Sequence, residues 1–144
     1  MGESTQHQLS LQRIVDYVSE TFGNVYSLSA LDDLPKRLGE DKPPLIGGYR
    51  PDFYARDVPL TTMIIGEAKT SQDIESEHTR KQFTAYLVRL THIPKGVLII
   101  AVAWRSVAAV RRILTQITGD QIVHGNTVKV VILDEMKEYV ILWP

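Results

Sequence analysis

Residues 47–70, GGYRPDFYARDVPLTTMIIGEAKT, contain two carboxylates and an ammonium whose neighbours are apolar or aromatic. Asp52 follows a proline, and Glu67 and Lys69 come fifteen residues later, separated from each other by one small residue. Two carboxylates that converge repel each other, and their burial is costly unless a positive charge lies between them. A divalent cation would supply that charge.

The same stretch predicts a β-hairpin with strands at residues 48–56 and 61–69. A hairpin centred on its Val-Pro turn pairs residues whose numbers sum to about 117, which sets Asp52 opposite a residue two positions before Glu67. Directly opposed residues point to the same face, and so do alternate residues of one strand. Asp52, Glu67 and Lys69 are therefore expected to converge, although a shift of one residue would turn Asp52 to the other face.

The types of these side chains define the chemistry. Oxygen ligands, with no cysteine or histidine in the cluster, favour magnesium or manganese over zinc. Magnesium held by one or two carboxylates keeps several waters, and one of them can become a nucleophile. Lys69 can hold that water and offset the charge that builds up on a phosphate. The cluster therefore predicts hydrolysis of a phosphodiester bond.

Pro51 and Asp52, followed by the run Glu-Ala-Lys at 67–69, resemble the motif of the PD-(D/E)xK nuclease superfamily. The predicted order of elements is similar to the restriction-endonuclease-like αβββαβ core. Gln82 and Tyr86 stand one helical turn apart and therefore point the same way, which resembles the Gln-x-x-x-Tyr helix of RecB-like nuclease domains. The resemblance covers about residues 9–103.

The resemblance implies a role for each matched residue. Asp52 and Glu67 would bind the metal together with the carbonyl of Ala68, and Lys69 would be catalytic.

Two further contributions are implied by the same family. Gln82 would position the catalytic lysine or the substrate, and Tyr86 would support the site. An acid from the first helix often completes such sites; Glu20 is the candidate here, and Asp16, one turn earlier, is the alternative.

The remaining periodicity predicts helices at 6–22, 74–90 and 105–118, and strands at 25–31, 97–103, 127–133 and 139–144. With the hairpin, the order becomes α, β, β, β, α, β, α, β, β. This alternation predicts an α/β fold, a mixed central β-sheet flanked by helices, in a single domain over residues 1–144. The run VLIIAVA predicts a central strand covered on both faces.

The net charge of −1 hides an uneven distribution. Residues 78–119 contain seven arginines and lysines and no acid, whereas residues 1–77 contain 13 acids and 7 bases. Such a block is a candidate surface for an anionic partner, although solvated helix faces would look the same. The residues expected to contact nucleic acid are His78, Arg80, Lys81, Arg111 and Arg112.

Composition excludes several other classes. The chain has no cysteine, so disulfides and thiolate metal sites are excluded. No run of 18 apolar residues predicts a membrane span, and the first ten residues do not resemble a secretory signal. A cytoplasmic location is expected.

These observations predict a magnesium-dependent nuclease that acts on DNA, as an endonuclease or an exonuclease. Small nucleases of this superfamily often form homodimers, and a recruiting protein would compensate for the lack of a specificity domain. The alternative is a catalytically inactive subunit that binds nucleic acid or assembles with other proteins. A third possibility is a structural α/β protein with an accidental motif.

Overall fold

The computed structural model describes residues 2–23, 29–32, 42–117 and 125–144. Its elements follow in the order α1 (Gly2–Phe22), β1 (Ser29–Asp32), β2 (Phe53–Arg56), β3 (Thr62–Ala68), α2 (Glu77–Thr91), β4 (Lys95–Ala101), the short 3-10 helix η2 (Trp104–Ser106), α3 (Val107–Ile117), β5 (Val128–Leu133) and β6 (Glu138–Trp143).

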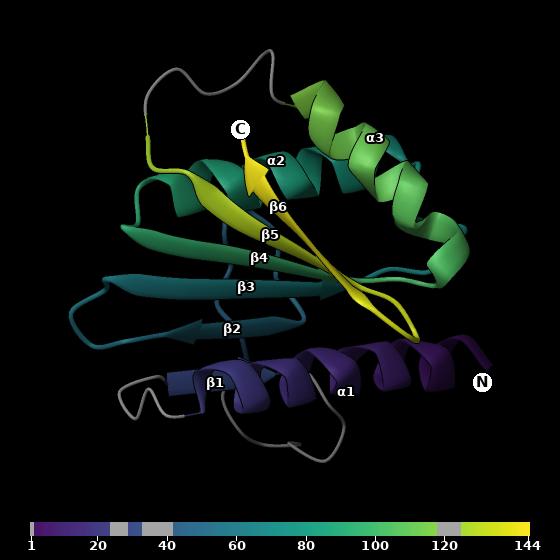
Figure 1. Cartoon of the computed structure of the whole chain (residues 1–144), viewed down its shortest axis with the longest axis horizontal. Helices are drawn as coiled ribbons and strands as arrows, with labels where there is room; N and C mark the ends of the chain where they lie inside the picture. The colour runs from purple at the N-terminus through teal and green to yellow at the C-terminus, as the bar shows by residue number, and fades with distance from the viewer. Residues whose placement is uncertain (1, 24–28, 33–41, 118–124) are drawn as a thin grey trace.

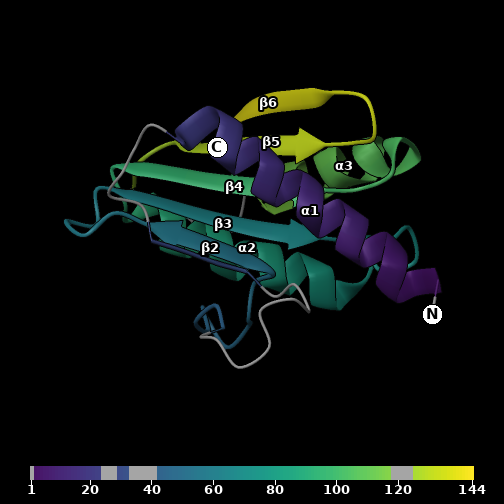
Figure 2. The ribbon, with the colours of Figure 1, turned by 90° about the horizontal axis from the view of Figure 1, so that it is seen from below.

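A six-stranded mixed sheet forms the centre of the protein, with strand order β1-β2-β3-β4-β5-β6. The pairs β3–β4 and β4–β5 are parallel, and the other three pairs are antiparallel. Figures 1 and 2 show α1 across one face of the sheet and α2 and α3 on the other face. The predicted fold class, a mixed sheet flanked by helices, is confirmed.

The predicted order of helices and strands is also confirmed, with shifted boundaries. The predicted strand at 48–56 shortens to Phe53–Arg56 because Gly47 and Gly48, with φ of 60° and 90°, form a turn instead. The second helix begins at Glu77, where Ser76 caps it by accepting a hydrogen bond from Thr79 N–H. Residues 25–28 of the first predicted strand, and residue 118 of the third predicted helix, lie outside the described residues.

Two apolar layers hold the helices against the sheet. Leu11, Ile14 and Val18 form one buried stripe on α1 and pack on β2, β3 and β4. Burying a side chain of this size contributes about 1.5–3 kcal/mol. Six consecutive residues of β4 are buried, as expected for a strand covered on both faces. Within the described residues, no helix is both long and apolar enough to cross a membrane.

The β2–β3 hairpin places the two carboxylates of the predicted cluster. Phe53 pairs with Gly66, so paired residues sum to 119 rather than the predicted 117. A difference of two keeps every side chain on its predicted face, because side chains alternate with a period of two. Continued by one position, the register sets Asp52 directly opposite Glu67.

Asp57 fixes this register at the turn. Its carboxylate accepts hydrogen bonds from the backbone N–H groups of Thr61, at 2.8 Å, and Thr62, at 3.0 Å. The Thr61 hydroxyl donates to the same carboxylate. These hydrogen bonds lower the pKa of Asp57 despite the opposing effect of burial. The turn is therefore closed by a side chain that the sequence did not identify.

Gly66 allows α1 to approach β3 closely. A Cβ atom at this position would lie 2.9 Å from Ile14 Cγ2 and 2.9 Å from Phe53 Cβ. These contacts are too short for a carbon atom, so any larger residue would push the helix away from the strand. The close approach matters because α1 contributes to the site described below.

We expect Gly66→Ala to lower the free energy of unfolding by about 1–3 kcal/mol, because the added methyl group overpacks a filled core. Urea unfolding followed by circular dichroism measures the change. Val140→Ala, on the exposed side of β6, is the control and should change stability by less than about 0.5 kcal/mol. Equal stability of Gly66→Ala and the wild type would contradict the close packing.

Candidate active site

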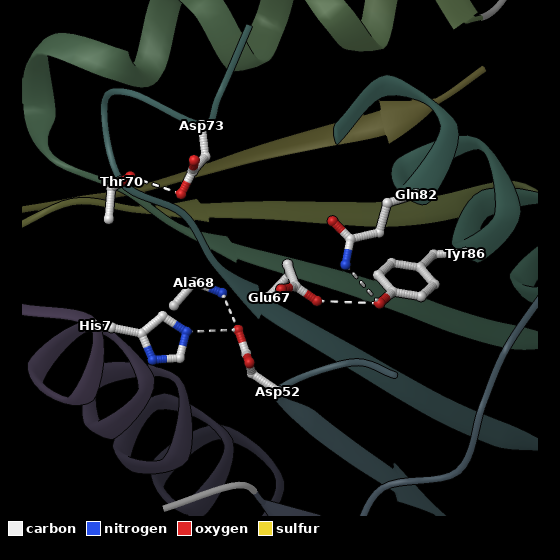
Figure 3. Close-up of polar contacts among 8 residues, drawn as sticks. All are labelled: His7, Asp52, Glu67, Ala68, Thr70, Asp73, Gln82 and Tyr86. Carbon is white, nitrogen blue, oxygen red and sulfur yellow. Dashed lines mark hydrogen bonds and ion pairs between the residues drawn. The ribbon is translucent and has the colours of Figure 1, made fainter. Parts of the chain in front are cut away.

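Asp52 and Glu67 meet at the end of the hairpin, as the sequence predicted. Asp52 precedes β2 and Glu67 is the penultimate residue of β3; they are 8% and 5% exposed. Their carboxyl groups lie close enough together for each to shift the pKa of the other. Figure 3 shows both side chains between α1, below them, and α2, above them.

Asp52 is the ionised member of the pair. Its Oδ2 accepts a hydrogen bond from the backbone N–H of Ala68 at 2.9 Å and lies 3.2 Å from Nε2 of His7 on α1. Burial raises the pKa of Asp52, but the hydrogen bonds from His7, Glu67 and Ala68 outweigh burial and lower it overall. The carboxylate is thus negatively charged although it is almost fully covered.

Glu67 is the member of the pair that holds a proton more tightly. Burial and then the neighbouring charge of Asp52 raise the pKa of Glu67 well above its usual value of 4.5. The charge of Lys69 and a hydrogen bond from Tyr86 oppose this rise without cancelling it. A proton bound by the pair is therefore held mainly on Glu67, where it relieves the repulsion between two negative charges.

Helix α2 supports Glu67 through a short chain of hydrogen bonds. The Tyr86 hydroxyl donates to Glu67 Oε1 at 3.1 Å, and Gln82 Nε2 donates to the Tyr86 oxygen at 3.1 Å. Burial, followed by the charge of Glu67, raises the pKa of Tyr86, so the hydroxyl remains a donor. Figure 3 shows the hydrogen bonds from Gln82 and to Glu67 meeting at the Tyr86 hydroxyl.

The other end of the Gln82 amide has an open hydrogen-bonding position. Its Oε1 atom is buried and has no hydrogen-bond partner among the residues that the structure describes. An unsatisfied buried acceptor costs about 1–3 kcal/mol. Such a cost is tolerable at a site where an ammonium group, a water or a substrate donor completes the network.

Lys69 is the first residue after β3 and is held there by its backbone. Its N–H donates to Ala101 O at 3.0 Å, which continues the β3–β4 pairing by one step. The side chain is half-buried, borders a pocket, and lies near enough to Glu67 for its charge to act on that carboxyl group. The predicted ammonium therefore acts electrostatically on Glu67, without an ion pair to either carboxyl group among the described residues.

The predicted acid from the first helix is not at this site. Glu20 is exposed and stands thirteen residues beyond His7, about 20 Å along the helix. Asp16, the alternative, is also exposed and accepts a hydrogen bond from Gln12 at 2.9 Å. The helix places His7 at the site instead, because it lies one turn before Leu11 on the buried stripe. The continuation of that stripe was the signal that could have identified it.

The predicted contacts with nucleic acid are scattered and partly occupied. Arg80 pairs with Glu77 at 2.8 Å, and Arg112 pairs with Glu75. Both carboxylates come from just before the acid-free block, so the fold neutralises part of the charge that stood alone in the sequence.

The other three predicted residues are also surface groups. Arg111 lies 5.2 Å from the centre of the Tyr139 ring, and His78 packs edge-on against Tyr49 at 5.3 Å. Lys81 is exposed. None of the three lines the pocket that Lys69 borders.

A metal site would have to be built mainly from oxygen atoms. In the parts of the chain that the structure describes, no three His, Cys, Asp or Glu side chains are arranged to hold a metal ion. Asp52, Glu67 and the Ala68 carbonyl nevertheless suit magnesium, which often takes one or two carboxylates and completes its shell with water. The repulsion that a shared proton relieves in this pair would equally be relieved by a divalent cation.

Comparisons of this chain with protein-family models, with curated proteins and with solved structures gave no match. The chemistry of the site therefore has to be inferred from its own geometry.

The raised pKa of Glu67 makes a prediction about stability without added metal. Between about pH 4.5 and the raised pKa, the folded protein binds more protons than the unfolded chain, so the free energy of unfolding should fall as pH rises. The slope should approach about 1.4 kcal/mol per pH unit. Glu67→Gln should remove it, because glutamine does not titrate. Urea unfolding from pH 5 to pH 8 in EDTA measures both slopes.

Glu20→Gln is the matched control, since it makes the same chemical change at an exposed position on α1. It should keep the slope of the wild type. Parallel slopes for the wild type and Glu67→Gln would show that Glu67 is ionised throughout this range.

Proposed function

We propose that this chain is a metal-dependent nuclease of the PD-(D/E)xK type that hydrolyses phosphodiester bonds in DNA. The observation that carries the proposal is the buried contact between Asp52 and Glu67, with Lys69 beside it at the carboxyl end of β3. The αβββαβ order of the first elements supports it. A purely structural protein gains nothing from two buried carboxyl groups in contact.

Asp52 and Glu67 would hold a magnesium or manganese ion. When bound, the ion supplies charge that neutralises the phosphate and makes a water molecule more acidic. The residues themselves provide orientation: Ala68 N–H fixes one oxygen of Asp52, and Tyr86 fixes one oxygen of Glu67. His7 contacts the same oxygen of Asp52 and further limits the rotation of that carboxylate.

Lys69 would stabilise the negative charge that develops on the phosphate during cleavage. Its position one residue beyond the strand lets the ammonium reach the pocket while the backbone stays fixed. The free acceptor of Gln82 is a natural partner for the lysine or for a water that it orients. A cytoplasmic location, a homodimer and a recruiting protein remain predictions of the sequence.

Substituting Lys69→Ala tests this function. The variant should lose magnesium-dependent cleavage by at least about 100-fold, because removal of one group that stabilises developing charge costs that much. It should still bind DNA and unfold like the wild type. A fluorescence assay with labelled single-stranded, double-stranded, flap and four-way-junction DNA, with and without magnesium, measures the rates.

Lys95→Ala is the matched control. Lys95 is an exposed lysine at the amino end of β4, the opposite end of the sheet from Lys69, and its loss should leave the rate unchanged. Absence of cleavage by the wild type on all four substrates, together with DNA binding that Lys69→Ala does not affect, would favour the inactive binding subunit.

A further inference from the structure

A pocket of about 520 Å³ is lined by His7, Ala68 and Lys69, which adjoin the carboxylate pair, while Asp52 and Glu67 themselves do not line it. Residues 68–72, after β3, form one wall; Ala103 and Arg105, after β4, form another; and Glu135, after β5, closes the end. The amino-terminal half of α1 covers it. The pocket therefore occupies the carboxyl ends of three parallel strands, which is where open α/β sheets bind their ligands.

The pocket is positively charged. Arg13, Lys69 and Arg105 line it, against one carboxylate, that of Glu135. One oxygen of that carboxylate is already occupied, because Glu135 Oε1 accepts a hydrogen bond from the backbone N–H of Trp104 at 2.8 Å. In the described residues, neither Arg13 nor Arg105 forms an ion pair, in contrast to Arg80 and Arg112.

The guanidinium of Arg13 has a donor that is available to an anion. Its Nη2 donates to Ser10 Oγ at 3.1 Å, but its Nε is buried and has no hydrogen-bond partner in the described part of the chain. A guanidinium has donors in a fixed fork that matches phosphate oxygens. Across the pocket, Arg105 Nε lies 3.5 Å from the Ser71 hydroxyl, which is itself a further donor to a phosphate.

The size of the pocket limits what can enter. Pockets of about 300–1,000 Å³ enclose a single drug-sized molecule. One nucleotide is of that size, whereas a stacked base pair with both of its strands is much larger. The occupant that fits both the charge and the volume is one unpaired nucleotide.

An aromatic side chain marks the rim. Trp104 lies between the lining residues Ala103 and Arg105 and is 67% exposed. Exposed aromatic rings next to positive charge are typical of proteins that bind single strands, because every base can stack on them.

We propose that this pocket binds one unpaired nucleotide of the substrate strand next to the bond that is cut. Arg13 and Arg105 hold its phosphate, and Trp104 contacts a base at the rim. The preferred substrate is therefore single-stranded at the cut, as in a flap, a gap or a frayed end. This inference rests on the proposed nuclease function for the position of the cut, while binding at the pocket can be tested separately.

The test uses the fluorescence of tryptophan in the full-length protein, in EDTA so that no metal-dependent cleavage occurs. The protein has two tryptophans, and Trp143 is only 2% exposed, so added ligand should alter mainly the signal of Trp104. A five-nucleotide thymidine strand should quench the fluorescence. A blunt DNA hairpin and inorganic phosphate at the same concentration should not.

Arg13→Ala and Arg105→Ala should each weaken binding of the strand at least tenfold. Arg105 is exposed, so its variant should fold normally even if the loss of Arg13 disturbs α1. Arg89→Ala, on α2 and outside the pocket lining, is the matched control and should bind like the wild type.

The outcomes distinguish the proposed nucleotide-binding pocket from the proposed nuclease function. If Arg105→Ala binds the strand as tightly as the wild type, the proposal that this pocket binds a nucleotide is wrong, even if the wild type cleaves DNA with magnesium. Equal quenching by the blunt hairpin overturns the preference for an unpaired nucleotide, and equal quenching by phosphate reduces the pocket to an anion site. If both arginine substitutions weaken binding but the wild type does not cleave DNA, the nucleotide-binding pocket is supported and the proposed nuclease function is rejected.

Discussion

The carboxyl groups of Asp52 and Glu67 lie in contact where water is largely excluded, and much of the surrounding structure serves to hold them there. Each group is costly to bury, and the contact is repulsive if both are ionised. The protein lowers this cost by hydrogen bonds to one oxygen of each group and by a proton shared between them. Sites that tolerate such a cost are usually functional, because selection for stability alone would replace them.

Three layers of the fold converge on that contact. From one face of the sheet, α1 brings His7 to Asp52; from the other, α2 brings Tyr86 to Glu67. The hairpin register, closed by Asp57, sets the two carboxyl groups opposite each other. Because each layer contributes a different partner, an error in any one of them would leave a buried charge without compensation.

The sequence predicted the parts of this arrangement that follow from periodicity. The register was wrong by two residues, but an even error preserves the face, so Asp52 still met Glu67. The net charge at the surface of the acid-free block, residues 78–119, was less predictable, because the carboxylates that pair with Arg80 and Arg112 are Glu77 and Glu75, which precede the block. The predicted helix at 6–22 included His7, but the family resemblance pointed to an acid on that helix rather than a histidine. His7 lies one turn before Leu11, so the apolar stripe could have placed it on the buried face.

The parallel strands explain why the chemistry and the charge lie at the same end of the sheet. β3, β4 and β5 run in the same direction, so the residues that follow them, Lys69, Arg105 and Glu135, are brought side by side although they are far apart in sequence. The antiparallel β2 adds Asp52 at that same end, since its first residue pairs near the last residues of β3. A mixed sheet therefore gathers carboxylates and cations from four strands at one edge. The arginines of the pocket and the carboxylate pair therefore lie at the same end of the sheet, which is the arrangement that the proposed nuclease needs to position a phosphodiester.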